Sequence, residues 1–188
     1  MRRLFAILLA TGLAAPAFAA DEAALLDEAR KVAMSIPPKL FKVLSEEIKK
    51  GGVEGAIPVC RDKAPQMAAA ASAETGWAIR RVSLKNRNPK AVPDAWERAV
   101  LEDFDKRTAA GEKPAAMEKG EVVVDGDKKV YRYMKALPTL DLCLSCHGTA
   151  DHITPAVKAR LDELYPDDKA VGYGLEAVRG AITIKKPL

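Results

Sequence analysis

Residues 121–135 read EVVVDGDKKVYRYMK and contain two runs of β-branched and aromatic residues on either side of Asp125-Gly126. An Asp-Gly pair between two such runs is a strong signal for a β-hairpin with a type I′ turn, so we predict strands at 121–124 and 128–135. Four strands interleaved with helices predict an α+β domain, an antiparallel sheet with flanking helices and a helical N-terminal portion. Two more strands are expected, at 77–84 and 180–185. The first two expected helices cover residues 22–36 and run from Leu40 to a stop at Gly51-Gly52. Two short helices are expected within residues 53–75, and two further helices at 93 to about 110 and at about 154 to 164.

The segment directly after the predicted hairpin, Cys143-Leu144-Ser145-Cys146-His147-Gly148, has the spacing of a covalent c-type haem site. Residues three and four apart share one face of a helix, so both thiols and the imidazole can reach one porphyrin. Cys143 and Cys146 would form thioethers with the haem vinyl groups, and His147 would supply the proximal iron ligand. The sequence therefore predicts one covalently attached haem c.

Zinc or dithiol chemistry is the alternative for this segment, because C-x-x-C also occurs in zinc sites and redox dithiols. A zinc ion needs four ligands, and here these would be Cys60, Cys143, Cys146 and His147. The adjacent residues Cys146 and His147 project in different directions, which makes a tetrahedral site awkward. Haem is therefore the preferred interpretation.

The first residues have the pattern of a secretory signal peptide. Arg2-Arg3 form a basic start, residues 4–13 are an apolar run too short to span a bilayer, and Ala17-Phe18-Ala19 matches a cleavage site. We predict that residues 1–19 are removed and that residues 20–188 form a single domain in the periplasm. An uncleaved membrane anchor is the alternative. Because c-type haem is assembled in the periplasm, the leader and the cysteine motif support each other.

The composition of the mature chain limits the expected partners. Removing the leader takes away two of the 30 basic residues and none of the 26 acidic ones. The numbers of positive and negative charges that remain are nearly equal, which gives no reason to expect nucleic acid or a membrane surface as a partner. The chain has three cysteines, so Cys60 has no disulfide partner within the chain if the other two hold haem.

Five segments carry a more specific pattern: AIPVC at 56–60, RVSLKNRNP at 81–89, CLSCHG at 143–148, YPDDKAVGY at 165–173 and RGA at 179–181. Through them the chain resembles the periplasmic c-type haem domains with a PAS-like fold, long described as a domain of unknown function. The similarity covers roughly residues 40–184. It implies a PAS-like fold and, from the A-I-x-x-C segment, a second axial ligand at Cys60. One departure is residues 174–177, which read GLEA where the family often has a Gly-Asp turn.

From the residues alone, Cys60 is either an iron ligand or a buried apolar cysteine, which is a common inert role. Every methionine of the mature chain precedes His147, whereas small electron-carrier cytochromes c place a methionine ligand after the motif. A thiolate ligand makes the ferric centre neutral, and reduction would then leave a negative charge in a low-dielectric pocket. Cys/His ligation therefore predicts a low reduction potential.

Arg81, Arg87 and Asn88 are candidates for contacts with the haem propionates, because a guanidinium fork matches a carboxylate. The alternative is a solvated basic strand and loop. Alternation along the predicted strand places Arg81 on the same face as Ile79, which favours a partner for this arginine. His152 lies five residues beyond the proximal ligand and is expected to be a surface histidine.

Together these features predict a periplasmic haem protein with six-coordinate iron that acts as a redox-responsive sensor or a low-potential electron-transfer protein. With both axial positions filled, no iron site is open to substrate, so we do not expect an enzyme. A plain respiratory electron carrier is one alternative, and a gas-binding haem protein is another if Cys60 dissociates. We expect an unidentified periplasmic redox or signalling partner, no nucleic acid and no membrane anchor after cleavage. The sequence does not indicate an oligomeric state.

Overall fold

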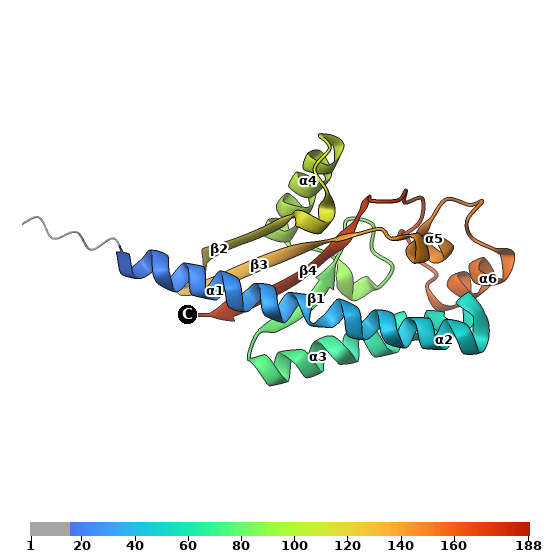
Figure 1. The fold of residues 1–188 in the computed structure, drawn as a ribbon, viewed down its shortest axis with the longest axis horizontal. Helices are drawn as coiled ribbons and strands as arrows, with labels where there is room; N and C mark the ends of the chain where they lie inside the picture. Colours follow the sequence, from blue (N-terminus) through green and yellow to red (C-terminus); the bar gives the residue numbers. More distant parts are fainter. Residues whose placement is uncertain (1–15) are drawn as a thin grey trace, which may run out of the picture.

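The computed structural model describes the backbone of residues 16–188 and the surroundings of the side chains from Asp21 onward. The basic start and the apolar run of the expected signal peptide lie outside the described residues. A four-stranded antiparallel sheet in the order β1-β4-β3-β2 forms the centre of the molecule (Figure 1). This architecture confirms the predicted α+β class with a PAS-like sheet. In the described part of the chain, no helix is both long and apolar enough to cross a membrane.

The predicted hairpin is present as β2 (Glu118–Asp125) and β3 (Lys128–Pro138). The predicted turn type is wrong, because Asp125 pairs with Lys128 and the two central residues are therefore Gly126 and Asp127. Only the first of them has a positive φ, 64° at Gly126. Glycine at the first central position is the pattern of a type II′ turn, whereas type I′ requires positive φ at both.

The other two predicted strands are also present, as β1 (Ala78–Val82) and β4 (Val178–Pro187). β4 lies in the middle of the sheet, between β1 and β3. Gly180, the third residue of this strand, has φ 132° and pairs with Leu137, next to a register shift between Leu137 and Pro138. A Cβ atom at Gly180 would collide with the carbonyl oxygen of Val82, so the close pairing of β4 with the end of β1 requires glycine here.

Helices cover both faces of the sheet, and the alternation of side chains along β3 (Lys128–Pro138) explains how. Tyr131 and Tyr133 point to the face covered by α1 (Pro16–Met34) and α3 (Ala64–Thr75), where Trp77 also packs. The other face is covered by α4 (Ala95–Ala109), which begins with an Asp94/Glu97 capping box. On that face lie Val82, Val100, Leu101, Phe104, Met117, Met134, Ala136, Val178 and Ala181.

Helix α2 (Ile36–Pro58) differs from the prediction, which ended it at Gly51-Gly52. Both glycines leave helical geometry, with φ −133° at Gly51 and φ 70° at Gly52, but the helix resumes directly afterwards. The resumed turn buries Ala56 and Ile57, and Ile57 packs against α6 (Pro155–Leu164). Burial of this apolar face favours continuing the helix beyond a kink over ending it at the glycines.

The two short helices expected within 53–75 are instead the end of α2, a π-helical turn η1 (Val59–Lys63) and α3 (Ala64–Thr75). Pro58 lies immediately before η1 and has no backbone N–H to donate, so the regular hydrogen-bond pattern is interrupted here. Cys60 is the second residue of this widened turn. The expected helices at about 93–110 and 154–164 are present as α4 and α6, the latter capped by Thr154.

Candidate functional site

The cysteine motif forms its own short helix, α5 (Asp141–His147), which starts three residues after β3 ends. Cys143 and Cys146 are one helical turn apart on it, and both are half-buried free thiols. Figure 1 shows α5 and α6 beyond one end of the sheet, close to the C-terminal part of α2. The hairpin strand β3 therefore delivers the motif to the same end of the molecule as Cys60.

A hydrogen bond from Nδ1 holds the ring of His147 in a defined orientation. Nδ1 lies 2.7 Å from the carbonyl oxygen of Ala170, which can only accept, so Nδ1 carries the proton and donates. Burial, together with the charges of Arg179 and Arg87, holds the pKa of His147 well below its ordinary value. The ring is thus neutral with its lone pair on Nε2, the tautomer that metal-binding histidines use when Nδ1–H bonds a carbonyl.

Gly148 brings the backbone after the motif close to α5. A Cβ atom here would lie 2.6 Å from the carbonyl oxygen of Leu144 and 2.8 Å from the Cβ of His152. The backbone N–H of Gly148 donates to that same carbonyl at 2.8 Å, which ends the helix. His152 itself is exposed and lies 2.9 Å from the hydroxyl of Thr149, so its surroundings are those of a surface histidine.

Arg87 and Asn88, both expected as propionate contacts, are engaged with the protein. The guanidinium of Arg87 donates to the carboxylate of Asp168 at 2.9 Å and to the carbonyl of Cys146 at 2.6 Å. It is only 8% exposed, and it ties the loop after α6 to the end of α5. Asn88 accepts from the backbone N–H of Lys90 at 2.9 Å and so caps the short helix η2 (Pro89–Ala91).

Arg179 is a site residue that the sequence analysis did not single out, although it stands in the RGA segment. It is 6% exposed, and its Nη2 lies 3.2 Å from Nε2 of His147. The guanidinium stacks 5.0 Å from the ring centre of Tyr173, and its Nε has no hydrogen-bond partner. Burial and the neighbouring charge of Arg81 lower the pKa of Arg179 to about 9. A signal was present in the sequence: an arginine directly before the small and apolar residues that start the predicted strand at 180–185.

Arg81 is the propionate candidate whose donors remain free. Its one hydrogen bond is long, 3.5 Å from Nη2 to the carbonyl oxygen of Arg179. The side chain is exposed, yet crowding by the surrounding protein lowers the pKa of Arg81. Exposure and a lowered pKa occur together when a side chain lies on the wall of an open hollow. Solvent can enter such a hollow, but protein atoms surround most of it.

Cys60 has the same combination of properties. Its thiol is exposed, burial nevertheless raises its pKa, and the positive charges of Arg81, Arg87 and Arg179 act on it in the opposite direction. Negative charge on Cys143 raises the pKa of the Cys60 thiol further. Burial raises the pKa of Cys146 to about 11, and negative charge on Cys60 acts in the same direction. The hydrogen bonds from Arg179 to His147, from Arg87 to the carbonyl of Cys146 and from Arg81 to the carbonyl of Arg179 agree with this. The three cysteines and these arginines therefore surround one region, between η1 on one side and α5 on the other.

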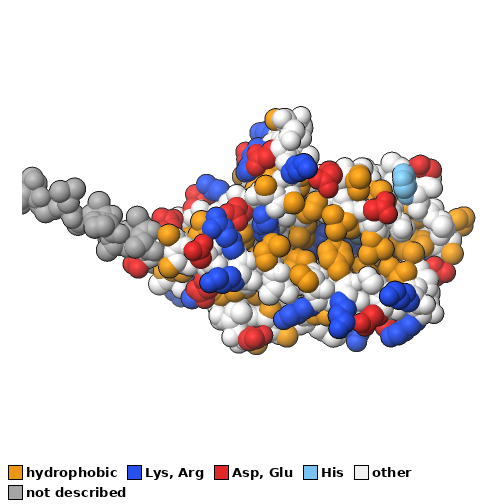
Figure 2. Space-filling model, in the orientation of Figure 1, with side chains coloured by type: hydrophobic (Ala, Val, Ile, Leu, Met, Phe, Trp, Pro, Cys, Tyr) orange, Lys and Arg blue, Asp and Glu red, His pale blue; other side chains and the backbone are white. Residues whose placement is uncertain are grey.

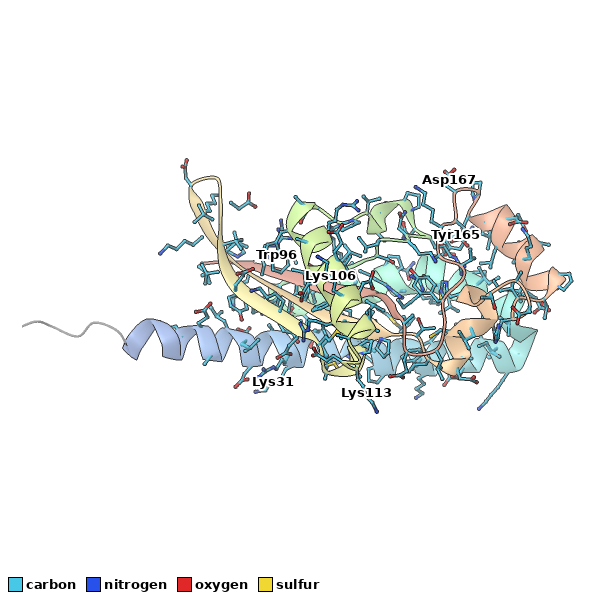
Figure 3. All side chains as sticks on the ribbon, turned by 90° about the horizontal axis from the view of Figure 1, so that it is seen from above. Lys31, Trp96, Lys106, Lys113, Tyr165 and Asp167 are labelled. Carbon is cyan, nitrogen blue, oxygen red and sulfur yellow. The ribbon has the colours of Figure 1, made fainter. Side chains whose placement is uncertain are left out.

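A recess is visible on one face of the molecule (Figure 2). Figure 2 shows hydrophobic side chains grouped around a recess in which a Lys or Arg side chain lies deeper. Figure 3 places Tyr165 and Asp167 on the segment after α6, at the end of the molecule opposite the start of α1. Tyr165 packs with Ile57 of α2, and Arg87 lies 5.7 Å from the centre of its ring.

The residues present fit a c-type haem better than a zinc ion. Two free thiols on one helical turn could form the thioethers, and His147 has an unprotonated Nε2, which now accepts from Arg179. The guanidinium of Arg179 is buried and its Nε has no hydrogen-bond partner, so an anion such as a propionate would fit beside it. Among the residues that the structure describes, no three His, Cys, Asp or Glu side chains come together to hold a metal ion.

Comparison with known proteins identifies the family. The Tll0287-like family model matches residues 15–187. The chain belongs to the Tll0287-like family. The crystal structure of the cyanobacterial heme-protein Tll0287 superimposes with a TM-score of 0.62 at 22% identity, covering 86% of this chain and 95% of that one. This likeness shows that the two proteins share a fold. No curated protein matches the chain at a significant level.

Proposed function

We propose that this protein is a periplasmic c-type haem protein with six-coordinate iron, acting as a redox-responsive sensor or low-potential electron-transfer protein. The observation that carries the proposal is the orientation of His147, which follows two free thiols on the same helix: its Nδ1 donates to the carbonyl of Ala170, and its Nε2 keeps a lone pair that accepts from Arg179. Membership of the Tll0287-like family supports it, because the cyanobacterial Tll0287 is a haem protein.

Each site residue has a role in this proposal. Cys143 and Cys146 anchor the porphyrin covalently, and His147 is the proximal ligand, oriented by Ala170. Cys60 is the second axial ligand, presented from the π-helical turn η1, a type of distortion that is frequent at functional sites. When bound, the haem supplies reversible one-electron chemistry of its iron, and the protein sets the potential through its ligands and surrounding charges.

Residues 1–19 act as a cleaved export signal, residues 20–188 form the single haem domain, and the protein is not an enzyme. Its partner is a periplasmic redox or signalling protein. The sensor and the simple electron carrier differ in one property: a carrier keeps both axial ligands in both oxidation states, whereas a sensor or gas binder releases Cys60 on reduction. A spectroscopic redox titration of the purified holoprotein distinguishes the two.

The test of the proposal is the intact mass and haem content of protein purified from the periplasm of a host that matures c-type cytochromes. We expect a chain that begins near Ala20 plus the mass of one haem, and colour that survives acid-acetone extraction. The variant Cys143→Ser/Cys146→Ser should lack covalent haem. A colourless wild-type protein, or one that carries zinc, would overturn the proposal.

A further inference from the structure

Three guanidinium groups act on the region between η1 and α5, but the protein supplies a carboxylate for only one of them. Arg87 pairs with Asp168, with 2.8 Å between Nη2 and Oδ2. Arg81 and Arg179 take part in no ion pair in the described part of the chain, although all three arginines act on the Cys60 thiol. The hollow therefore carries two uncompensated positive charges.

Arg179 has the greater need of an anion. Its side chain is buried, its Nε is unpartnered, and its Nη1 makes only a long contact of 3.5 Å with the hydroxyl of Ser83. Its best acceptor is Nε2 of His147, at 3.2 Å. An iron bound to Nε2 would take the space that this guanidinium now fills, so Arg179 would turn away from His147 and lose this acceptor as well. A buried guanidinium without any acceptor is costly, so the same hollow has to provide a new one.

We propose that Arg179 and Arg81 form a clamp that binds the propionate carboxylates of the haem. This inference rests on the proposed function, since it needs a haem in the hollow. Two unpaired guanidiniums match the two carboxylates of one haem in charge, and the planar fork of arginine matches a carboxylate in shape. The clamp comes from two neighbouring strands, because Arg81 of β1 lies opposite Ile182 of β4 and its Nη2 reaches the carbonyl of Arg179.

The clamp separates the roles of the arginines around the site. Arg87 holds the protein together by joining Asp168 to the carbonyl of Cys146, whereas Arg81 and Arg179 face the cofactor. The competing role for the pair is electrostatic only: two charges that stabilise the Cys60 thiolate without touching a propionate. The two roles predict different spectra, because only direct hydrogen bonds change the vibrations of a propionate group.

The test uses the holoprotein and the variants Arg179→Gln, Arg81→Gln and Arg179→Lys. The control is Arg98→Gln, which removes the same charge from an exposed position on α4. Resonance Raman spectroscopy reports the propionate bending band, and a redox titration reports the midpoint potential. We expect Arg179→Gln and Arg81→Gln each to shift the band and lower the potential. Arg179→Lys should restore the potential but not the full wild-type band, and Arg98→Gln should leave both unchanged.

A propionate band that stays unchanged in both glutamine variants would overturn the clamp, even if the potential falls, and would assign the pair the electrostatic role alone. If Arg179→Gln does not fold, Arg81→Gln decides, because Arg81 is exposed and makes only one long hydrogen bond. Failure of the proposed function has a different signature, since the wild-type protein would then contain no covalent haem at all.

Discussion

At the scale of single residues, the chemistry of the site depends on which atom of each side chain is left free. His147 keeps Nε2 available because Nδ1 is committed to the carbonyl of Ala170. Arg87 is already engaged in part, because its Nε donates to Asp168 and its Nη2 donates to the carbonyl of Cys146. Cys60 is exposed and has no disulfide partner on a widened turn, so its sulfur is free to contact a ligand.

Replacement of Cys60 tests its role directly. We expect Cys60→Ala to retain covalent haem, because the thioethers depend on Cys143 and Cys146. The variant should lose the thiolate charge-transfer bands and its reduction potential should rise, since the ferric state loses a compensating negative charge. Cys60→Met should also raise the potential, through a neutral ligand. Optical spectroscopy with redox titration checks this, and an unchanged spectrum and potential in Cys60→Ala would return Cys60 to a structural role.

Gly180 is a residue whose conformation only glycine tolerates. Its φ of 132° and the collision of a Cβ with the carbonyl oxygen of Val82 predict that Gly180→Ala lowers the free energy of unfolding by about 1–3 kcal/mol or more. Urea unfolding measures the loss. The control is Gly55→Ala, at a helical position with open space around it, which should leave stability unchanged or raise it by up to about 1 kcal/mol. Similar effects in both variants would contradict this account of β4.

At the scale of elements, side-chain hydrogen bonds orient a helix on the sheet. Helix α1 is tied to the edge strand β2 by Arg30, whose Nε donates to Glu118 at 2.8 Å, and Tyr133 of β3 donates to the same carboxylate at 2.7 Å. These bonds lie beside the Trp77 and Tyr131 core, where the two rings pack edge to face at 6.1 Å. The polar contact therefore orients a helix whose attachment comes mainly from apolar burial.

Docking of α1 should depend on pH through Glu118. The hydrogen bond from Arg30, followed by that from Tyr133, holds the pKa of Glu118 below its ordinary value of 4.5. A lowered pKa in the folded state contributes stability above the unfolded pKa, and this contribution is lost as pH falls through the lowered value. Urea unfolding between pH 7 and pH 3 should show Glu118→Gln less stable at neutral pH by about 1 kcal/mol, with the gap closing in acid. A gap that is independent of pH would refute this.

At the scale of the whole molecule, the fold brings strand ends, a widened helical turn and a short helix around one hollow that the protein alone does not neutralise. The haem-free variant Cys143→Ser/Cys146→Ser should therefore unfold at a lower urea concentration than the holoprotein, because unpaired guanidiniums remain in the hollow and bound ligand no longer stabilises the native state. Added sodium chloride should narrow the difference by screening these charges. Equal stability of the two proteins at low salt would contradict a haem-binding role for the hollow.

Local spacing in the sequence was enough to predict the four strands, the hairpin, the helices at about 93–110 and 154–164, and the helical turn that carries Cys143, Cys146 and His147. These features depend on residues a few positions apart, and their physical causes, which are the alternation of strands, the periodicity of helices and turn preference, act over the same short range. The Gly51-Gly52 kink escaped prediction because burial of Ile57 against α6 outweighs the local preference of glycine to end a helix.

Tertiary structure alone decided which polar side chains meet at the site. Arg87 lies 81 residues from Asp168, and Arg179 lies 32 residues from His147, so no local pattern relates their guanidiniums to these partners. Arg81, Arg87 and Asn88 were all candidates for propionate contacts in the sequence. Packing of the loop after α6 against α5 gave Arg87 a carboxylate, and the pairing of β1 with β4 left Arg81 and Arg179 without one. Whether the charges in a hollow are neutralised depends on which side chains surround it, and only the folded molecule determines which side chains these are.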